Sequence, residues 1–332
     1  MHQYVERLHG LVLDEELFGD RIVRFLYSQA RERAPFLFRL ATSARISSLL
    51  GWCNFDLRLV PQLLGNAAFL RRCGVDLAEC LAPPAHFTTP RRIFERQIVY
   101  WRCRPMPCDP RAVVSPADAR VIIGSLAADS ALFLKGKFFD FAELLGQGEG
   151  RWLAAFAEGD YAIFRLTPDK YHYNHTPVAG RVVDHYLLDG VYHSCNPGAV
   201  VAMVTPYSKN RRVVTIIDTD VEGGTGVGLV AMIEVVAMMI GDIVQCYSDT
   251  AYDWPQPVRP GMFVVKGVPK SLYRPGSSTD ILLFEKGRVR FADDLVEKGR
   301  RADVASRFSI GFGQPLVEVE IKVRSLLAIA RQ

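Results

Sequence analysis

The chain has 332 residues, a hydrophobic fraction of 49% and a charged fraction of 23%, values that exclude a disordered or collagen-like protein. Its formal net charge of +4 is too small to indicate a nucleic-acid-binding protein, so no nucleic-acid partner is expected. The seven cysteines are an odd number and form no CxxC pair, which argues against a disulfide framework or a zinc knuckle and favours a reducing compartment.

Residues 1–108 place apolar side chains at helical spacing and predict a helical N-terminal region. This region begins with early acidic residues and has no long apolar stretch there, so we expect no secretory signal. Two interpretations fit residues 31–52, where arginines are interspersed among apolar residues. The segment either packs within a helical bundle or lies on a membrane surface, as basic amphipathic helices do.

Beyond residue 108 the sequence changes to short β-branched runs separated by Gly, Pro and Asp. The scarcity of helix-length amphipathic segments favours a mostly antiparallel sheet over a repeating βαβ pattern. We therefore predict an α+β fold, with an N-terminal helical segment packed on a β-rich domain of residues 109–332. The longest nearly apolar run, 227–240, contains Glu234 and is shorter than the roughly 20 residues of a spanning helix. The expected location is cytoplasmic, or peripheral on the cytoplasmic face of the membrane.

Two segments contain candidate functional side chains, although an Asp in a turn is common in its own right. Asp118 lies in a turn signal, Ser-Pro-Ala-Asp at 115–118, that leads into a predicted strand. His172 and His175 lie three residues apart, shortly before Pro177. The proline favours an extended backbone, which directs the two imidazoles to opposite faces, so no shared metal site is predicted. Imidazole titrates near neutral pH, and proton transfer suits these histidines better.

Two other segments contain glycine-rich turns. The run 222–228 lacks the Lys-Ser/Thr of a phosphate loop and is better explained as a connection between strands. The sequence Gly-Ser-Ser-Thr at 276–279 leads directly into a predicted buried strand. It is either a tight turn of small residues or a strained turn that exposes a hydroxyl for nucleophilic attack.

Taken together and in this order, these segments resemble the phosphatidylserine decarboxylase family, whose members are self-cleaving proenzymes that carry a pyruvoyl group. The resemblance is carried by Ser-Pro-Ala-Asp at 115–118, by Tyr-His-Tyr-Asn-His-Thr-Pro-Val-Ala-Gly at 171–180, and by Lys-Gly at 266–267 followed by Gly-Ser-Ser-Thr at 276–279. It continues through Gly-Gln-Pro-Leu at 313–316 and spans most of the chain.

The resemblance implies a catalytic trio of Asp118, His175 and a serine at 277 or 278. The histidine activates the serine hydroxyl to attack the preceding carbonyl, and the chain is cleaved near 276–278. The serine then becomes a covalent pyruvoyl group, an electron sink comparable to PLP, so no external cofactor is expected. His172 is implied to contact the substrate carboxylate or to protonate the product.

Two ways of aligning the cleavage segment leave the identity of the serine open. Counting back from Leu283 and Phe284 gives Ser278, and a strand register is unforgiving of a shift. Counting forward from Lys266 gives Ser277, where the preceding glycine eases the strained geometry of cleavage. We take Ser278 as the cleavage serine and pyruvoyl precursor, with Ser277 as the alternative.

Several residues depart from the family pattern. Ala119 replaces a glycine, Tyr173 replaces an arginine, and Glu234 interrupts an apolar run. A buried acid costs several kcal/mol unless it is paired. Three arrangements of Glu234 are therefore possible: it has a partner, it lies outside the core, or it lies in the substrate pocket. In the pocket it would bind a substrate amine or hydroxyl. The resemblance implies a divergent member of the family.

The expected function is decarboxylation of phosphatidylserine to phosphatidylethanolamine. The alternatives are decarboxylation of a free amino acid, with an aromatic one as an option, and a non-catalytic β-rich binding module that keeps the fold. The expected partners are an amino-phospholipid or amino-acid substrate, a peripheral membrane contact, and the protein's own large and small subunits as a heterodimer. A homodimer remains open.

Overall fold

The structure is a computed structural model that describes residues 2–15, 56, 63, 65–126, 140–202, 206–237, 242–276 and 278–331. The segment 31–52, predicted to contact either a helical bundle or a membrane, lies outside the described residues, and so does Ser277. Within those described ranges, no helix combines the length and the apolar character needed to cross a membrane.

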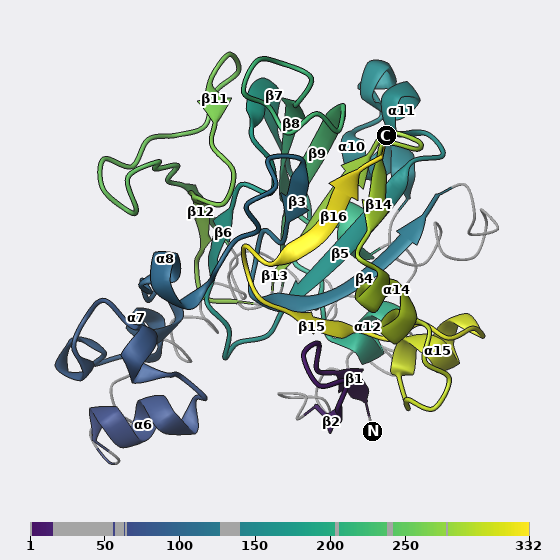
Figure 1. Ribbon diagram of the computed structural model, residues 1–332. Helices are drawn as coiled ribbons and strands as arrows, with labels where there is room; N and C mark the ends of the chain where they lie inside the picture. The colour runs from purple at the N-terminus through teal and green to yellow at the C-terminus, as the bar shows by residue number, and fades with distance from the viewer. Residues whose placement is uncertain are drawn as a thin grey trace.

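The central element is a ten-stranded sheet (Figure 1). All neighbouring strands in it are antiparallel except β1 and β15, which are parallel. This arrangement confirms the α+β fold and the mostly antiparallel sheet expected from the short β-branched runs. In spatial order the strands are β11 (Phe263–Val264), β7 (Gly180–Leu188), β8 (Arg212–Asp218), β9 (Leu229–Val236), β13 (Ser278–Phe284), β5 (Asp160–Leu166), β4 (Ala119–Ser125), β15 (Val319–Ile321), β1 (Gln3–Val5) and β2 (Val12–Asp14).

Two three-stranded sheets accompany the central one. The first contains β10 (Ile243–Gln245), β12 (Pro269–Tyr273) and β6 (Tyr173–His175), and the second contains β14 (Val289–Phe291), β16 (Leu326–Ala330) and β3 (Ala112–Val114). Strand β13 is buried along its whole length, since it lies between β9 and β5. Its alternate side chains enter two cores: Leu282 packs in a cluster with residues of the second small sheet, and Leu283 in a cluster with helical residues.

Short helices surround these sheets. Helices α6 (Asn66–Arg72), α7 (Pro90–Phe94) and α8 (Tyr100–Cys103) lie together beside β6 and β12 (Figure 1). Thr89 begins α7, since its hydroxyl accepts a hydrogen bond from the Arg92 amide, and Pro90 fits the first helical position. The remaining helices are α10 (Phe141–Leu145), α11 (Gly150–Phe156), α12 (Pro197–Ala202), α13 (Pro206–Lys209), α14 (Asp293–Gly299) and α15 (Arg307–Phe312).

The start of the chain differs from the predicted helical N-terminal region, because β1 and β2 are extended and join the central sheet. A buried network of charges holds them there. His2 Nε2 lies 2.8 Å from Glu318, and Arg165 bonds to Glu318 at 2.8 Å and to Glu15 at 2.7 Å. Although the His2, Glu15 and Glu318 ligand atoms are close enough to share a cation, Arg165 and Arg120 already pair with the two carboxylates. The His2 and Arg165 contacts join residues 150 to 316 positions apart in sequence, beyond the reach of local periodicity.

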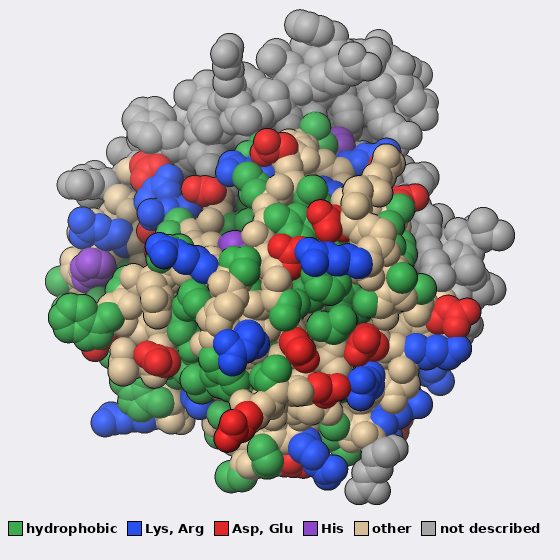
Figure 2. All heavy atoms as spheres, turned by 90° about the horizontal axis from the view of Figure 1, so that it is seen from above, with side chains coloured by type: hydrophobic (Ala, Val, Ile, Leu, Met, Phe, Trp, Pro, Cys, Tyr) green, Lys and Arg blue, Asp and Glu red, His purple; other side chains and the backbone are tan. Residues whose placement is uncertain are grey.

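Acidic and basic side chains are interspersed on the surface seen from above (Figure 2). The described part of this face therefore carries no broad region of a single sign, in keeping with the small net charge of +4.

Candidate active site

Strand β6 brings three predicted site segments together. The His175 amide donates to the carbonyl of Pro116 at 2.7 Å, which links the strand to the turn that carries Asp118. Just before the strand, the carbonyl of His172 accepts a hydrogen bond from the Tyr273 amide at 3.1 Å. Tyr273 ends β12, and the predicted cleavage segment follows it directly. Both predicted histidines thus lie between the aspartate turn and the cleavage segment.

His175 is fully buried and bonded through both ring nitrogens. Its Nδ1 lies 3.0 Å from the carbonyl oxygen of Gly267, and because a carbonyl only accepts, Nδ1 carries the proton. Its Nε2 is then the acceptor for the Tyr171 hydroxyl at 2.9 Å. Burial lowers the pKa of His175 to about 3, so the ring is neutral near pH 7 and its unprotonated Nε2 is an acceptor.

His172 is also fully buried, and its ring stacks on Phe94 with centroids 3.5 Å apart. Neither ring nitrogen makes a well-formed hydrogen bond within the described part of the chain. The backbone of Lys170 raises the pKa of the ring, but it is not among the largest influences. Burial, followed by the charge of Arg96, lowers the pKa of His172 to about 3. An unpartnered buried polar atom is costly, so this neutral ring is suited to bind a ligand.

Asp118 is buried in an ion pair rather than hydrogen-bonded to histidine. Arg104 donates to it from Nη2 at 2.7 Å and also binds Glu79 at 2.6 Å, and the Val323 amide donates to Oδ1 at 2.8 Å. Burial would raise the pKa of Asp118, but the charge and hydrogen bonds of Arg104, together with the hydrogen bond from the Val323 amide, outweigh burial and lower the pKa. The Asp118 carboxylate acts on His175 through its field, raising the histidine pKa, and no side-chain hydrogen bond joins the two residues among those described.

Ser278 is the first residue of β13 and is paired with Leu166 on one side and Val236 on the other. Its side chain is buried, and Oγ has no hydrogen-bond partner among the described residues. Gly276, two residues earlier, has a φ of +154°, a value that residues with side chains rarely adopt. The cleavage segment therefore combines an unusual backbone conformation with an unpartnered hydroxyl.

Glu234 lies in the core and is partnered, which is one of the three arrangements considered from the sequence. Its Oε2 is 2.6 Å from Lys270 Nζ and 3.0 Å from Gln245 Nε2. Its Oε1 accepts from Ser271 and, at 3.3 Å, from Asn174. Because both oxygens are engaged by the protein, these contacts favour a structural role for Glu234 over contact with substrate.

Two buried residues of this region were not recognised in the sequence: Lys270 and Asp280. Asp280 stands directly opposite Glu234 in the pairing of β13 with β9. The Tyr273 hydroxyl lies 2.7 Å from Asp280 Oδ1, and Oδ2 has no partner in the described structure. Burial and the charge of Glu234 raise the pKa of Asp280 well above its usual range, so the side chain is a neutral acid. Its position two residues after the serine was the available signal.

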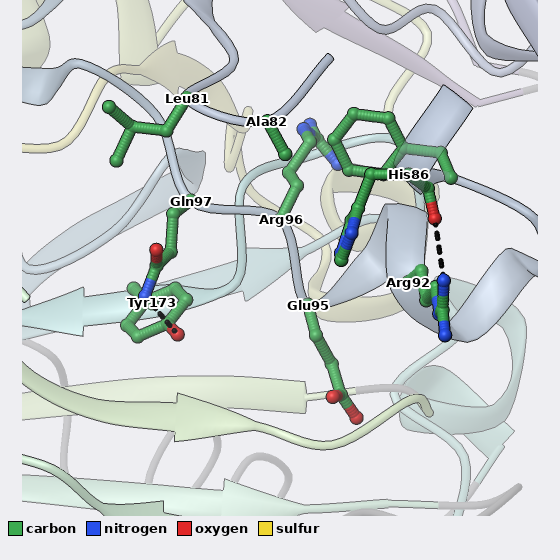
Figure 3. Close-up of a pocket in the computed structure, with 9 residues that line it drawn as sticks. Leu81, Ala82, His86, Arg92, Glu95, Arg96, Gln97 and Tyr173 are labelled. Carbon is green, nitrogen blue, oxygen red and sulfur yellow. Dashed lines mark hydrogen bonds between the residues drawn. The ribbon is translucent and has the colours of Figure 1, made fainter. Parts of the chain in front are cut away.

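A cavity of about 480 Å³ lies between α7 and β6 (Figure 3). Its lining includes Arg92, Arg96, Gln97 and Tyr173. Arg96 connects the cavity to His172 electrostatically, because its charge helps to lower the pKa of that histidine.

Comparison with known proteins identifies relatives of this chain. The family model described as phosphatidylserine decarboxylase matches residues 93–310, a range that includes Asp118, both histidines and the two serines. The chain is 28% identical over 302 residues to the phosphatidylserine decarboxylase proenzyme of Chlamydia pneumoniae, covering 90% of this chain and 92% of that protein. The corresponding proenzyme of Chlamydia trachomatis serovar L2 is 30% identical over 294 residues, covering 88% and 90%. That of Fusobacterium nucleatum is 26% identical over 298 residues, covering 89% and 91%.

Proposed function

The chain belongs to the phosphatidylserine decarboxylase family, and we propose that it decarboxylates phosphatidylserine to phosphatidylethanolamine after cleaving itself before Ser278. The observation that carries this proposal is the buried Ser278 hydroxyl, which has no hydrogen-bond partner among the described residues and begins the central strand of the sheet. An unpartnered hydroxyl is free to react, and its dry surroundings fit a precursor of the small, uncharged pyruvoyl group.

Self-cleavage begins when Ser278 Oγ attacks the carbonyl carbon of residue 277. The new C–O bond replaces the peptide C–N bond, so an ester forms and the amino group of residue 278 is released. We assign the removal of the hydroxyl proton to Nε2 of neutral His175. The charge of Asp118 raises the pKa of that histidine, which helps the ring to hold the proton. Elimination then breaks the ester, and hydrolysis with loss of ammonia leaves the pyruvoyl group.

In decarboxylation, the pyruvoyl group supplies an electron sink for the pair of electrons released with CO₂. His172 is the residue we assign to the substrate, because its ring nitrogens are buried without well-formed hydrogen bonds among the described residues. Its stacking on Phe94 fixes the plane of the ring. The low pKa of about 3 keeps the ring neutral, so it binds by hydrogen bonding rather than by charge.

Cleavage before Ser278 divides the protein into a large chain of 277 residues and a small chain of 332 − 277 = 55 residues. The small chain would begin with β13, whose seven residues pair with β5 on one side and β9 on the other. These two ladders support a stable heterodimer of the large and small chains.

A lipid substrate also requires access to a membrane, and we propose a peripheral contact. Flotation with vesicles that contain anionic phospholipid tests this contact directly. Protein that floats with such vesicles, and not with neutral ones, supports it, whereas protein that stays with the soluble fraction in both cases contradicts it.

The proposal is tested by the intact mass and activity of three proteins: the wild type, Ser278→Ala and Ser277→Ala. We expect the wild type to contain two chains, with a pyruvoyl group on the small one, and to decarboxylate phosphatidylserine. Ser278→Ala should remain a single inactive chain, while Ser277→Ala should still be cleaved. An active wild type that consists of one uncut chain would overturn self-processing. Turnover of a free amino acid alone would replace the lipid substrate with the amino-acid alternative.

A further inference from the structure

Arg96 is a buried cation in the wall of the cavity between α7 and β6 (Figure 3), and its charge acts on His172. It is 7% exposed, and its guanidinium donates to the backbone carbonyls of Ile93 at 3.1 Å and Asp169 at 2.7 Å. It forms no ion pair with a carboxylate in the described part of the chain. A buried charge is stabilised poorly by carbonyl groups alone, so Arg96 is suited to receive an anion.

Other arginines nearby form ion pairs with carboxylates, unlike Arg96. Arg104 is neutralised by Asp118 and Glu79, and Arg91 is neutralised by Asp56. The acidic side chain that does line the cavity, Glu95, is bonded to Arg91 at 3.3 Å and to Arg274 at 2.8 Å. The charge of Glu95 is therefore already balanced from outside the cavity.

The other polar groups around the cavity favour an anionic ligand as well. Arg92 and His86 lie on the same side as Arg96 in Figure 3, while Gln97 and Tyr173 lie on the other. The Gln97 amide donates to the Tyr173 hydroxyl at 3.3 Å. The cavity thus presents two guanidinium groups next to neutral hydrogen-bonding groups.

We infer that this cavity binds the headgroup of the phospholipid, with Arg96 holding the phosphodiester. This inference rests on the proposed function. The departing carboxylate loses its charge as CO₂ forms, so a cation paired with it would stabilise the substrate more than the transition state. The phosphodiester keeps its charge throughout, and a cation there strengthens binding without slowing the reaction. Arg96 is accordingly a binding residue that distinguishes a phospholipid from a free amino acid.

The test uses the self-processed protein with a soluble short-chain phosphatidylserine and compares Arg96→Gln, Arg96→Lys and Arg72→Gln with the wild type. A charged hydrogen bond is worth roughly 10- to 100-fold in binding, so Arg96→Gln should raise KM by about that factor and leave kcat within about threefold. Arg96→Lys should recover part of the loss. Arg72, exposed at the end of α6 and outside the cavity lining, is the control and should leave KM unchanged.

A binding measurement separates this inference from the proposed function. By calorimetry, glycerophosphoserine should bind the wild type and lose roughly 10-fold or more in affinity with Arg96→Lys or Arg96→Gln. Inorganic phosphate tests whether the phosphate alone suffices, and free serine should bind far more weakly than either. Loss of kcat with an unchanged KM, or equal affinity of wild type and Arg96 variants for glycerophosphoserine, would overturn the inference. If Arg96→Gln fails to self-process, Arg96→Lys decides the question. Failure of the wild type to decarboxylate phosphatidylserine would instead overturn the proposed function.

Discussion

Two buried polar regions meet at the centre of the sheet, and they differ in how their hydrogen bonds are satisfied. Around Glu234, the carboxylate oxygens are engaged by Lys270, Gln245 and other neighbours on β6 and β12. Across the strand pair, Ser278 Oγ and Asp280 Oδ2 are buried without a partner in the described structure. Most buried polar atoms in proteins are hydrogen-bonded, so the satisfied region is suited to hold the sheet together and the unsatisfied one to do chemistry.

The position of the two regions explains why one supports the other. Glu234 and Asp280 are directly opposed in the β9–β13 ladder, and two carboxylates so close cannot both ionise cheaply. Glu234 carries the charge, because the Lys270 ammonium group lies 2.6 Å from it and stabilises the carboxylate. The Glu234 charge and burial then keep Asp280 neutral. The cleavage strand therefore has an uncharged face next to Ser278.

The largest effect is expected from Lys270→Met, which disrupts the hydrogen-bonded region around Glu234. The substitution leaves the Glu234 charge buried without its cation, which typically costs about 3–5 kcal/mol of unfolding free energy. We expect that loss in urea unfolding followed by tryptophan fluorescence, measured in the uncleaved Ser278→Ala chain so that each protein is a single polypeptide. The matched control is Lys286→Met, which removes an exposed ion pair with Glu158 and should change stability little. Equal effects of the two substitutions would show that the Glu234 pair does not anchor the sheet.

The central strand shows how far the sequence could be interpreted. Residues 281–284 were expected in a buried strand, and β13 has this position and is buried throughout. The continuous apolar run was the informative signal, because both faces of the strand are buried. The run from 227 onward was recognised as nearly apolar, and it forms β9. The acid within it raised a question that the sequence alone could not answer, since its cation lies 36 residues away and comes into contact through strand pairing.

The N-terminal region shows the opposite case. Val12 and Leu13 were included in a helical pattern, yet they belong to β2. Strand β1 joins the sheet because Val5 pairs with Val319, a contact between chain ends that outweighs local propensity. The predicted trio shows a similar limit: β6 lies next to the Asp118 turn, but the pairing of Asp118 with Arg104 has no signature in the spacing of motifs. Arg96 lay within the predicted helical region, without a pattern to indicate that it would be buried.

A second substitution, Asp280→Asn, tests whether the side chain beside Ser278 is uncharged. It replaces a neutral acid with a neutral amide of similar shape. In the folded protein the pKa of Asp280 is raised, so folding requires proton uptake at any pH between the unfolded and folded values. Stability from this group is present below the unfolded pKa and is lost as the pH rises toward the folded pKa. Asparagine removes that loss. From pH 5 to pH 7 the variant should therefore gain relative to its parent by up to about 1.4 kcal/mol per pH unit.

Urea unfolding of Asp280→Asn and its parent at pH 5, 6 and 7 checks this trend, again in the uncleaved chain. If the difference in unfolding free energy between variant and parent does not change with pH, Asp280 is ionised in the folded state. The face of β13 beside Ser278 would then carry a charge. The companion substitution Asp293→Asn, at an exposed acid in α14, controls for the effect of removing any acidic side chain.

The smallest expected effect concerns His172, and it has the opposite dependence on pH. The pKa of His172 is lowered to about 3 in the folded protein, against about 6.5 for an unperturbed histidine. Above pH 6.5 neither state binds the proton and the group contributes nothing. As the pH falls below 6.5 the unfolded chain takes up a proton that the folded chain does not, so stability decreases, by about 1 kcal/mol between pH 6 and pH 5. His172→Phe should reduce the slope by that amount, while His175, whose pKa is also lowered to about 3, keeps its own contribution. Phe94→Leu, which alters the stacked ring but keeps the histidine, should lower the unfolding midpoint at both pH values and leave the slope in place. A slope that is the same in His172→Phe as in the parent would assign the whole titration to other residues, and the buried, neutral state of His172 would no longer explain how it meets the substrate.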